Sequence, residues 1–171
     1  MRNRLVSLGL AVGLLLLCCP PSDACGDKFL RMGRGLRNAR ATRPASILIY
    51  MKPDSVVPAA ARELKLSASL QRAGHRIRAV EGANELEAAL MSGTYDIVVG
   101  DPASATVIAR MPTGKSKPSF LPVLLKPTPQ ELAAAEKRYR CFLAAPGRAY
   151  TSLAEIDHVM QERQKGARAG L

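Results

Sequence analysis

Residues 95–101 have the sequence YDIVVGD, in which the apolar run Ile97–Val99 is followed by a glycine and then by Asp101. An apolar run without polar alternation is typical of a strand that is buried on both faces, as in a parallel sheet covered by helices. In an open sheet of this kind, ligands bind at the carboxyl ends of the strands. The segment predicts a fold class, and it puts an acidic side chain where that class places its chemistry.

Segments on both sides of this run repeat the pattern of a strand followed by a helix. Strands are predicted at 46–50, 75–81, 95–101, 120–125 and 141–145. Helices are predicted after them at 53–73, 84–92, 103–111, 129–140 and 152–163, most with glycine or proline at a boundary. Because strands and helices alternate, we predict an α/β fold: a doubly wound, five-stranded parallel sheet with helices on both faces.

The composition suits one domain with an aliphatic core. The chain has 171 residues, of which 47% are hydrophobic but only 4% aromatic, and it has no tryptophan. Its net charge is +11, of which the first 24 residues contribute +1 through Arg2, Arg4 and Asp23, and this leaves +10 for the rest. Such a basic surface attracts an acidic protein partner, envelope polysaccharide or an anionic membrane surface. Nucleic acid is not expected, because aromatic residues do not interleave with the basic ones as single-strand binding requires.

The amino terminus has the parts of a secretory signal. Two arginines near the start precede the apolar run Leu5–Leu17, and Ser22 and Ala24 lie three and one residues before a cleavage point. The run has 13 residues, fewer than the roughly 20 that a membrane-spanning helix needs. We predict a signal peptide at 1–24 and an exported protein of the periplasm or cell envelope.

Cleavage after Ala24 makes Cys25 the first residue of the mature chain and leaves three alternatives for its thiol. It is lipidated and anchors a lipoprotein to the membrane, it pairs with Cys141 in a disulfide, which an oxidising compartment permits, or it is free. Residues 25–45 are predicted to form a basic linker with regularly spaced arginines. The polar carboxyl-terminal residues 166–171 are predicted to be a disordered tail.

Between residues 46 and 165 the chain resembles a response-regulator receiver domain, whose topology is flavodoxin-like. Three stretches carry the resemblance: SILIYMK at 46–52, ALMSGTYDIVVGD at 89–101, and FLPVLLKPTPQELAAAEKRYRCFLAAP at 120–146. They are similar to the first receiver strand, to the strand that ends in the phosphate-accepting aspartate, and to the fourth and fifth strands. The resemblance implies the same doubly wound sheet, with Asp101 at the position of the phosphoacceptor.

The other chemical positions of a receiver are occupied by residues that lack its chemistry. Where the resemblance implies two magnesium-binding acids, this chain has Met51 and Lys52; Lys126 stands where the family has serine or threonine, and Ala145 where it has lysine. Magnesium requires an octahedral set of carboxylate and water oxygens, which a thioether and an ammonium group do not supply. We predict a degenerate pseudo-receiver in which Asp101 does not accept phosphate but pairs with Lys52 or caps the helix that follows.

A non-catalytic protein-interaction or signalling scaffold of the cell envelope is the expected function. Receivers dock partners through the face of their fourth and fifth helices and fifth strand, and tyrosine and arginine are favoured at interaction hot spots. The corresponding residues here are Glu136, Arg138, Tyr139, Arg140 and Tyr150. Two alternatives stay open: an exported protein that binds a small anion or other ligand at Lys52 and Lys126 near Asp101, and a phosphoacceptor receiver of a two-component system.

No pattern in the sequence predicts a cofactor or a metal site. His75 and His158 are the only histidines, neither has a second ligand at metal-binding spacing, and both are interpreted as surface residues. Cys25 and Cys141 are isolated from other ligands in the sequence. The GKS sequence at 114–116 precedes a predicted strand, whereas a phosphate-binding loop opens a helix after a strand.

Overall fold

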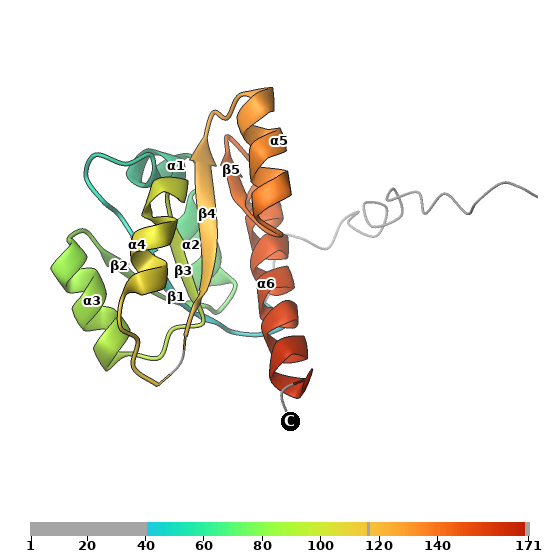
Figure 1. The fold of residues 1–171 in the computed structure, drawn as a ribbon. Coiled ribbons are helices and arrows are strands. Elements are labelled where there is room, and N and C mark those ends of the chain that lie inside the picture. Colours follow the sequence, from blue (N-terminus) through green and yellow to red (C-terminus); the bar gives the residue numbers. More distant parts are fainter. Residues whose placement is uncertain (1–40, 116, 170–171) are drawn as a thin grey trace, which may run out of the picture. The chain divides into compact units, whose positions relative to one another are not determined.

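One sheet of five parallel strands lies at the centre of the computed structural model, which describes residues 41–115 and 117–169 (Figure 1). The strands are β1 (Ser46–Tyr50), β2 (Arg76–Val80), β3 (Ile97–Gly100), β4 (Ser119–Leu125) and β5 (Leu143–Ala145). Their spatial order is β2-β1-β3-β4-β5, and every neighbouring pair is parallel. This order is compatible with a flavodoxin-like fold, and it confirms the predicted α/β class.

The predicted amino-terminal features, the signal segment 1–24 and Cys25 with most of the linker, lie outside the described residues. The end of that linker is part of the fold. Ala45 is buried, and its carbonyl accepts a hydrogen bond from the N–H of Arg76 at the start of β2. The described domain includes residues 41–45, ahead of the predicted boundary at residue 46.

Six α-helices and one short 3₁₀-helix, η3, connect the strands within the described ranges. They are α1 (Val57–Glu63), α2 (Leu66–Arg72), α3 (Ala83–Ser92), η3 (Pro102–Ser104), α4 (Ala105–Arg110), α5 (Pro129–Arg138) and α6 (Ala149–Ala169). The first helix, predicted as continuous over 53–73, is divided into α1 and α2. The reason is Lys65, which adopts the left-handed conformation with φ of 47°, because a right-handed helix cannot continue through such a residue.

Helix α6 is longer than the sequence predicted. It runs from Ala149 to Ala169, so the disordered tail predicted at 166–171 is wrong for its first four residues. The side chain of Arg163 donates a hydrogen bond to the carbonyl oxygen of Lys117 at 2.8 Å, which holds the late turns of α6 near the start of β4. The single glycine in those turns costs a helix only about 1 kcal/mol.

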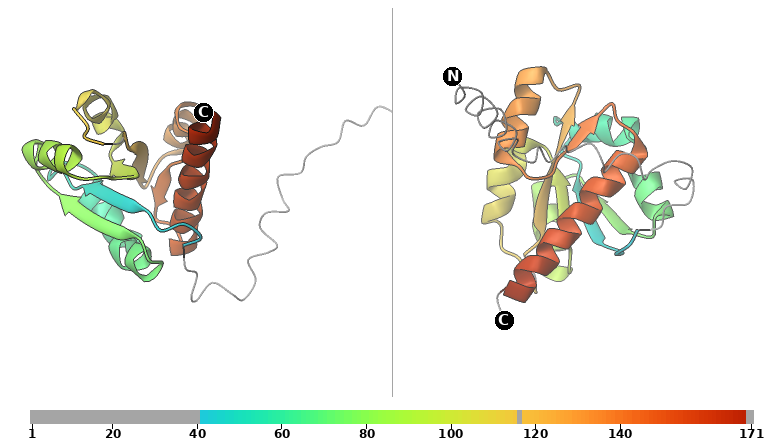
Figure 2. Two further views of the ribbon diagram at one scale, coloured as in Figure 1. Left: turned by 90° about the horizontal axis from the view of Figure 1, so that it is seen from below. Right: turned by 90° about the vertical axis from the view of Figure 1, so that its right-hand side faces the viewer.

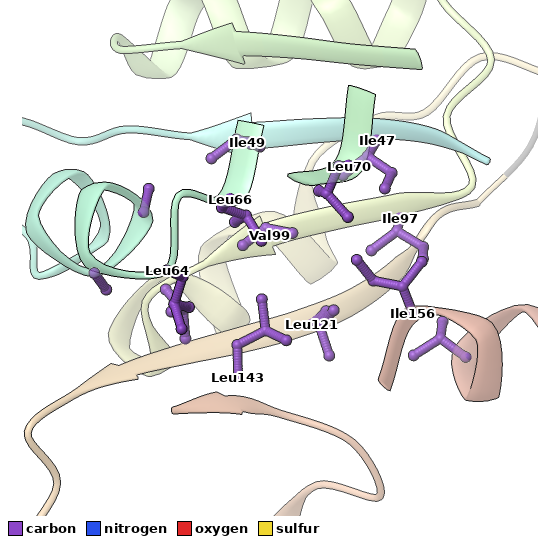
Figure 3. Packing of buried hydrophobic residues seen from close by; sticks show 14 of the residues in the cluster. Ile47, Ile49, Leu64, Leu66, Leu70, Ile97, Val99, Leu121, Leu143 and Ile156 are labelled. Atoms are coloured by element: carbon purple, nitrogen blue, oxygen red, sulfur yellow. The ribbon is translucent and has the colours of Figure 1, made fainter. Parts of the chain in front are cut away.

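The sheet separates two apolar layers, because side chains alternate between its faces along each strand. On one face, α1, α2 and α6 pack over Ile47, Ile97 and Leu121, which are completely buried (Figure 3). Helices α3 and α4 cover the other face of the sheet (Figure 2), where Leu48 and Val98 are buried in the second apolar layer. Burying each such side chain stabilises the fold by about 1.5–3 kcal/mol. This packing holds the strands in place, and with them the residues at the strand ends.

His75 is buried, and the prediction that it lies on the surface is wrong. Only 4% of it is exposed, and its Nδ1 accepts a hydrogen bond from the N–H of Ala45 at 3.1 Å. Burial lowers the pKa of this histidine, although the charge of Asp157 acts in the opposite direction. This hydrogen bond links the segment before β1 to the turn before β2, so His75 has a structural role.

Candidate functional site

The carboxyl ends of four strands carry the residues at receiver-like positions, and we call this set the strand-end edge. Its members are Met51 and Lys52 after β1, Asp101 after β3, Lys126 after β4 and Ala145 at the end of β5. Strands β1 and β3 are neighbours, whereas β2 lies on the other side of β1. The chain connections diverge between β1 and β3, which makes this the topological switch point at which sheets of this type bind ligands. The structure thus brings the residues at receiver-like positions to one edge of the sheet.

The carboxylate of Asp101 is used as a helix cap. Its Oδ1 accepts a hydrogen bond from the backbone N–H of Ser104 at 2.8 Å, and Asp101 is the N-cap of η3, which leads into α4. The same N–H also donates to the backbone oxygen of Asp101 at 3.1 Å, so the side chain adds a second and shorter bond; a side-chain cap of this kind is worth about 0.5–2 kcal/mol. Of the two structural roles predicted for Asp101, the structure shows the cap.

The two lysines of the strand-end edge are not paired with Asp101. Lys126 Nζ lies 3.8 Å from Glu63 Oε1, and 72% of the lysine side chain is exposed. Lys52 is also exposed, and none of the ion pairs in the described part of the chain joins it to Asp101. The predicted pair between Lys52 and Asp101 is not formed, because the cap directs the carboxylate toward Ser104.

The strand-end edge offers no magnesium-binding set among the residues that the structure describes. In those ranges, the one group of three or more acidic, histidine or cysteine side chains with ligand atoms within 4.8 Å of one another lies elsewhere. Met51 is partly buried against the larger of the two apolar layers, the one covered by α1, α2 and α6, and its thioether supplies no oxygen ligand. Among the described residues, the strand-end edge therefore lacks the oxygen ligands that receivers use to hold magnesium, and one oxygen of Asp101 is engaged in the cap.

Three of the residues predicted as an interaction face lie together where α5 ends, and we call Arg138, Tyr139 and Arg140 the α5 end. The Arg138 guanidinium is 5.4 Å from the centre of the Tyr139 ring. Arg140 Nη1 lies 3.1 Å from Glu162 Oε2 of α6. Glu136 is exposed on the last turn of α5. Four of the five predicted residues are therefore near neighbours along the chain.

Tyr150 lies apart from the α5 end. It is in the first turn of α6, which follows β5, whereas Arg140 precedes β5, so the two residues lie at opposite ends of that strand. Tyr150 and Glu162, the partner of Arg140, are twelve residues apart in α6, which is about 18 Å along a helix axis. The guanidinium of Arg148 contacts the Tyr150 ring, 5.8 Å from its centre. The predicted face is not one continuous patch.

Cys141, Glu155 and His158 come together beside the start of β5, and we call them the cysteine cluster. One ligand atom of each lies within 4.8 Å of the other two, and Cys141 Sγ is 3.5 Å from His158 Nδ1. Glu155 and His158 are three residues apart on α6, so they share a face of that helix. Cys141 is buried, Glu155 is half-buried and His158 is exposed, so the cluster opens to solvent on its histidine side.

Burial keeps the thiol of Cys141 protonated. Burial and the negative charge of the neighbouring Glu155 raise the pKa of Cys141 from 9.0 to about 11. Burial also raises the pKa of Glu155, although the nearby Cys141 and His158 oppose this. A nucleophilic cysteine needs a lowered pKa, because the thiolate is the reactive form. The cluster lacks the electrostatics of a cysteine-nucleophile site, despite the adjacent histidine.

Sequence patterns predicted no metal site and missed this cluster, in which the structure brings three possible ligands together. Cys141 is distant from the other two residues in the chain, and His158 beside Asp157 has the pattern of a solvated helix surface. The signal that could have identified the cluster is the spacing of Glu155 and His158 on a helix that packs back over the strand of Cys141. Cys141 has no disulfide partner among the described residues; its pairing with Cys25, which lies outside them, stays a prediction.

Comparisons with known proteins do not show a family for this chain. No protein-family model matches it, and no curated protein matches it significantly. Within residues 41–115 and 117–169, none of the helices combines the length and the apolar character that crossing a membrane demands.

Proposed function

We propose that this protein is an exported receiver-like domain that acts without catalysis, as a protein-interaction or signalling module of the cell envelope. The observation that carries the proposal is the hydrogen bond from the N–H of Ser104 to Asp101 Oδ1, at 2.8 Å. This bond gives the one acid retained at a receiver-like position a structural task. The order of the five parallel strands is compatible with a receiver-like fold, and Met51, Lys52, Lys126 and Ala145 lack receiver chemistry at the other positions.

The charges at the strand-end edge support the absence of phosphorylation chemistry. Phosphoryl transfer to a carboxylate brings negative groups together, and a magnesium ion offsets their repulsion. Met51 and Lys52 stand where two acids would hold that ion, and Lys126 is paired with Glu63. A phosphate-driven switch has no support at this edge, whereas an interaction surface needs none of these residues.

Exposure to phosphoryl donors and mimics tests the non-catalytic part of the proposal. The full chain is incubated with Mg²⁺ and either acetyl phosphate or beryllofluoride; adducts are followed by intact mass and by fluorine NMR, with Asp101→Asn as the matched control. We expect no stoichiometric adduct and no Mg²⁺-dependent change in melting temperature. A stoichiometric adduct on the parent chain that Asp101→Asn abolishes would overturn the proposal in favour of a phosphoacceptor receiver.

The α5 end is the surface that we assign to partner binding. Arg140 has 84% of its side chain exposed, Arg138 is exposed, and the Tyr139 ring lies between them in the sequence with the Arg138 guanidinium 5.4 Å from its centre. An aromatic ring with one guanidinium group beside it, followed in the chain by a second exposed arginine, suits an acidic protein surface. The net charge of +10 that remains after removal of residues 1–24 favours the same kind of partner.

Partner capture with charge-matched variants tests this surface. Envelope extract is passed over the parent chain, over the double variant Arg138→Glu/Tyr139→Ala, and over Arg110→Glu, which removes an arginine from α4 instead. We expect the parent and Arg110→Glu to retain the same acidic partner and the double variant to lose it while still folded by circular dichroism. Loss from Arg110→Glu as well would indicate unspecific charge attraction, and retention by the double variant would remove the α5 end from the proposal.

Export is tested by the mass of the mature amino terminus in cells. A chain that begins at Cys25 supports cleavage after Ala24, and an added diacylglycerol mass on Cys25 supports the membrane-anchored alternative. An unmodified Cys25 leaves the disulfide and the free thiol. A chain that keeps residues 1–24 would contradict export through a cleaved signal.

A further inference from the structure

The cysteine cluster gathers a sulfur, a nitrogen and an oxygen donor at one point. Ligand atoms of Cys141, Glu155 and His158 lie within 4.8 Å of one another, and the proposed interaction function uses none of them. Thiolate and imidazole are ligands of zinc and other transition-metal ions, whereas magnesium and calcium are bound by oxygen. We propose that Cys141, Glu155 and His158 form a binding site for a divalent transition-metal ion of the zinc class.

The spacing of the donor atoms matches a tetrahedral zinc site. Zinc–sulfur and zinc–nitrogen bonds of about 2.3 and 2.0–2.1 Å, at the tetrahedral angle, place the two donors about 3.5 Å apart. The observed distance from Cys141 Sγ to His158 Nδ1 is 3.5 Å. The carboxylate of Glu155 lies within 4.8 Å of both, so a side-chain shift of about 1 Å brings an oxygen to the spacing that the third tetrahedral ligand requires.

Ordered elements hold these donors in place. Ile156 and Val159, which flank the ligands on α6, are 0% and 7% exposed in the larger apolar layer, and Cys141 belongs to the same layer. Their burial fixes the backbone of α6 against the sheet, so little freedom is lost when an ion binds. His158 is exposed, and its side of the cluster gives an ion a path from solvent.

Charged neighbours complete the surroundings of the site. Glu162, one turn beyond His158 on α6, lies 2.8 Å from Lys165 Nζ and 3.1 Å from Arg140 Nη1. Because two cations already engage Glu162, we assign it to the surroundings and not to the ligands. Three protein ligands leave the fourth tetrahedral position to water, as in zinc sites that exchange ligands.

Binding exchanges a proton for the metal ion. The thiol of Cys141 releases its proton to solvent as the sulfur–metal bond forms, Glu155 binds as a carboxylate, and His158 binds through a neutral ring nitrogen. No electron is transferred, and one thiol proton is released for each ion bound. The step requires no reactant other than the ion.

Cobalt(II) is the probe, because it occupies zinc sites and reports their ligands. Thiolate ligation gives a near-ultraviolet charge-transfer band, and tetrahedral geometry gives strong visible bands. The full chain, with Cys18→Ser, Cys19→Ser and Cys25→Ser so that Cys141 is its only thiol, is titrated with cobalt. We expect one cobalt per chain, both sets of bands, and their loss when one equivalent of zinc is added.

Variants of the individual ligands test the assignment. His158→Ala changes an exposed helix position to the best helix former, so it keeps the fold, which circular dichroism checks. His158→Ala and Glu155→Gln should each weaken cobalt binding at least about 10-fold, whereas Glu136→Gln, an equally conservative change on α5, should bind like the parent. The proposal is overturned if the folded parent shows no thiolate band with one equivalent of cobalt, or if His158→Ala and Glu155→Gln bind as tightly as the parent.

Discussion

The strand-end edge and the cysteine cluster differ in where they lie and in how their side chains are engaged. At the edge, where the topology concentrates ligand sites, Asp101 is occupied by a helix cap and Lys126 by Glu63. Beside the start of β5, a position that this topology does not mark for ligands, the donor atoms of Cys141 and His158 face each other at 3.5 Å. The difference teaches that a fold determines where side chains meet, whereas their identities determine whether that place has chemistry.

The largest effect is expected where α6, the helix that carries two residues of the cysteine cluster, is packed against the sheet. Ile156 is 0% exposed on α6, so Ile156→Ala should lower the free energy of unfolding by about 2–5 kcal/mol, because the truncation leaves a cavity. Urea unfolding followed by circular dichroism measures this. Val107→Ala, at a residue that is 55% exposed on α4, is the control and should change the same free energy by less than about 0.5 kcal/mol. A small loss at both positions would mean that α6 is not docked as the cluster requires.

The protonation state of Cys141 gives the next largest effect. Its pKa of about 11, in place of 9.0, lowers the thiolate fraction near neutral pH about 100-fold, since each pKa unit is a factor of ten. With a chelator present, iodoacetamide should alkylate Cys141 at least about 100-fold more slowly than an unshifted cysteine thiol, and the rate should still rise as the pH approaches 11. Mass spectrometry of the Cys141 peptide over a pH series measures the rate.

Glu155→Gln tests how much the charge of Glu155 contributes to the raised pKa of Cys141. The charge of Glu155 adds to the effect of burial in raising the pKa of Cys141, so its removal should favour the thiolate and speed alkylation. Glu136→Gln removes the same charge from the α5 surface and should leave the rate unchanged. Equal rates in the parent and Glu155→Gln would show that the carboxylate does not act on the thiol.

A smaller effect is expected at the helix cap of the strand-end edge. Asp101→Ala should lower the free energy of unfolding by about 1 kcal/mol, because the N–H of Ser104 loses its side-chain acceptor at 2.8 Å and keeps only the backbone oxygen of residue 101, at 3.1 Å. Asp101→Asn keeps a capping oxygen and should cost much less. Both values come from urea unfolding. If the two variants lose the same free energy, the negative charge of Asp101 and not its cap is what stabilises the protein.

The sheet and the role of Asp101 could be predicted because their signals are local. Apolar runs such as Ile47–Ile49 and Ile97–Val99 are bounded by glycine and proline, and these determine the strands without knowledge of their partners. The donor that Asp101 caps is three residues along the chain. The break at Lys65 could not be predicted, because a left-handed lysine leaves no mark in the sequence as a glycine would.

The cysteine cluster could not be predicted because it depends on packing. Cys141 and His158 are 17 residues apart, and their contact exists only because α6 packs back over β5. The division of the predicted interaction face has the same cause. Tyr150 and Arg140 are close in the sequence, but β5 lies between them and carries them to opposite ends of the strand.

The smallest effect is expected at Lys126, which tests whether the strand-end edge binds anions. Its Nζ lies 3.8 Å from Glu63 and 72% of its side chain is exposed, so Lys126→Ala should change the free energy of unfolding by less than about 0.5 kcal/mol. Calorimetric titrations with phosphate and sulfate should show no saturable binding to the parent or to Lys52→Ala. The titrations discriminate because an anion site at this edge would have to use Lys52 and Lys126, which follow β1 and β4. Saturable phosphate binding that Lys126→Ala removes would make the strand-end edge a ligand site and reverse the comparison with the cysteine cluster.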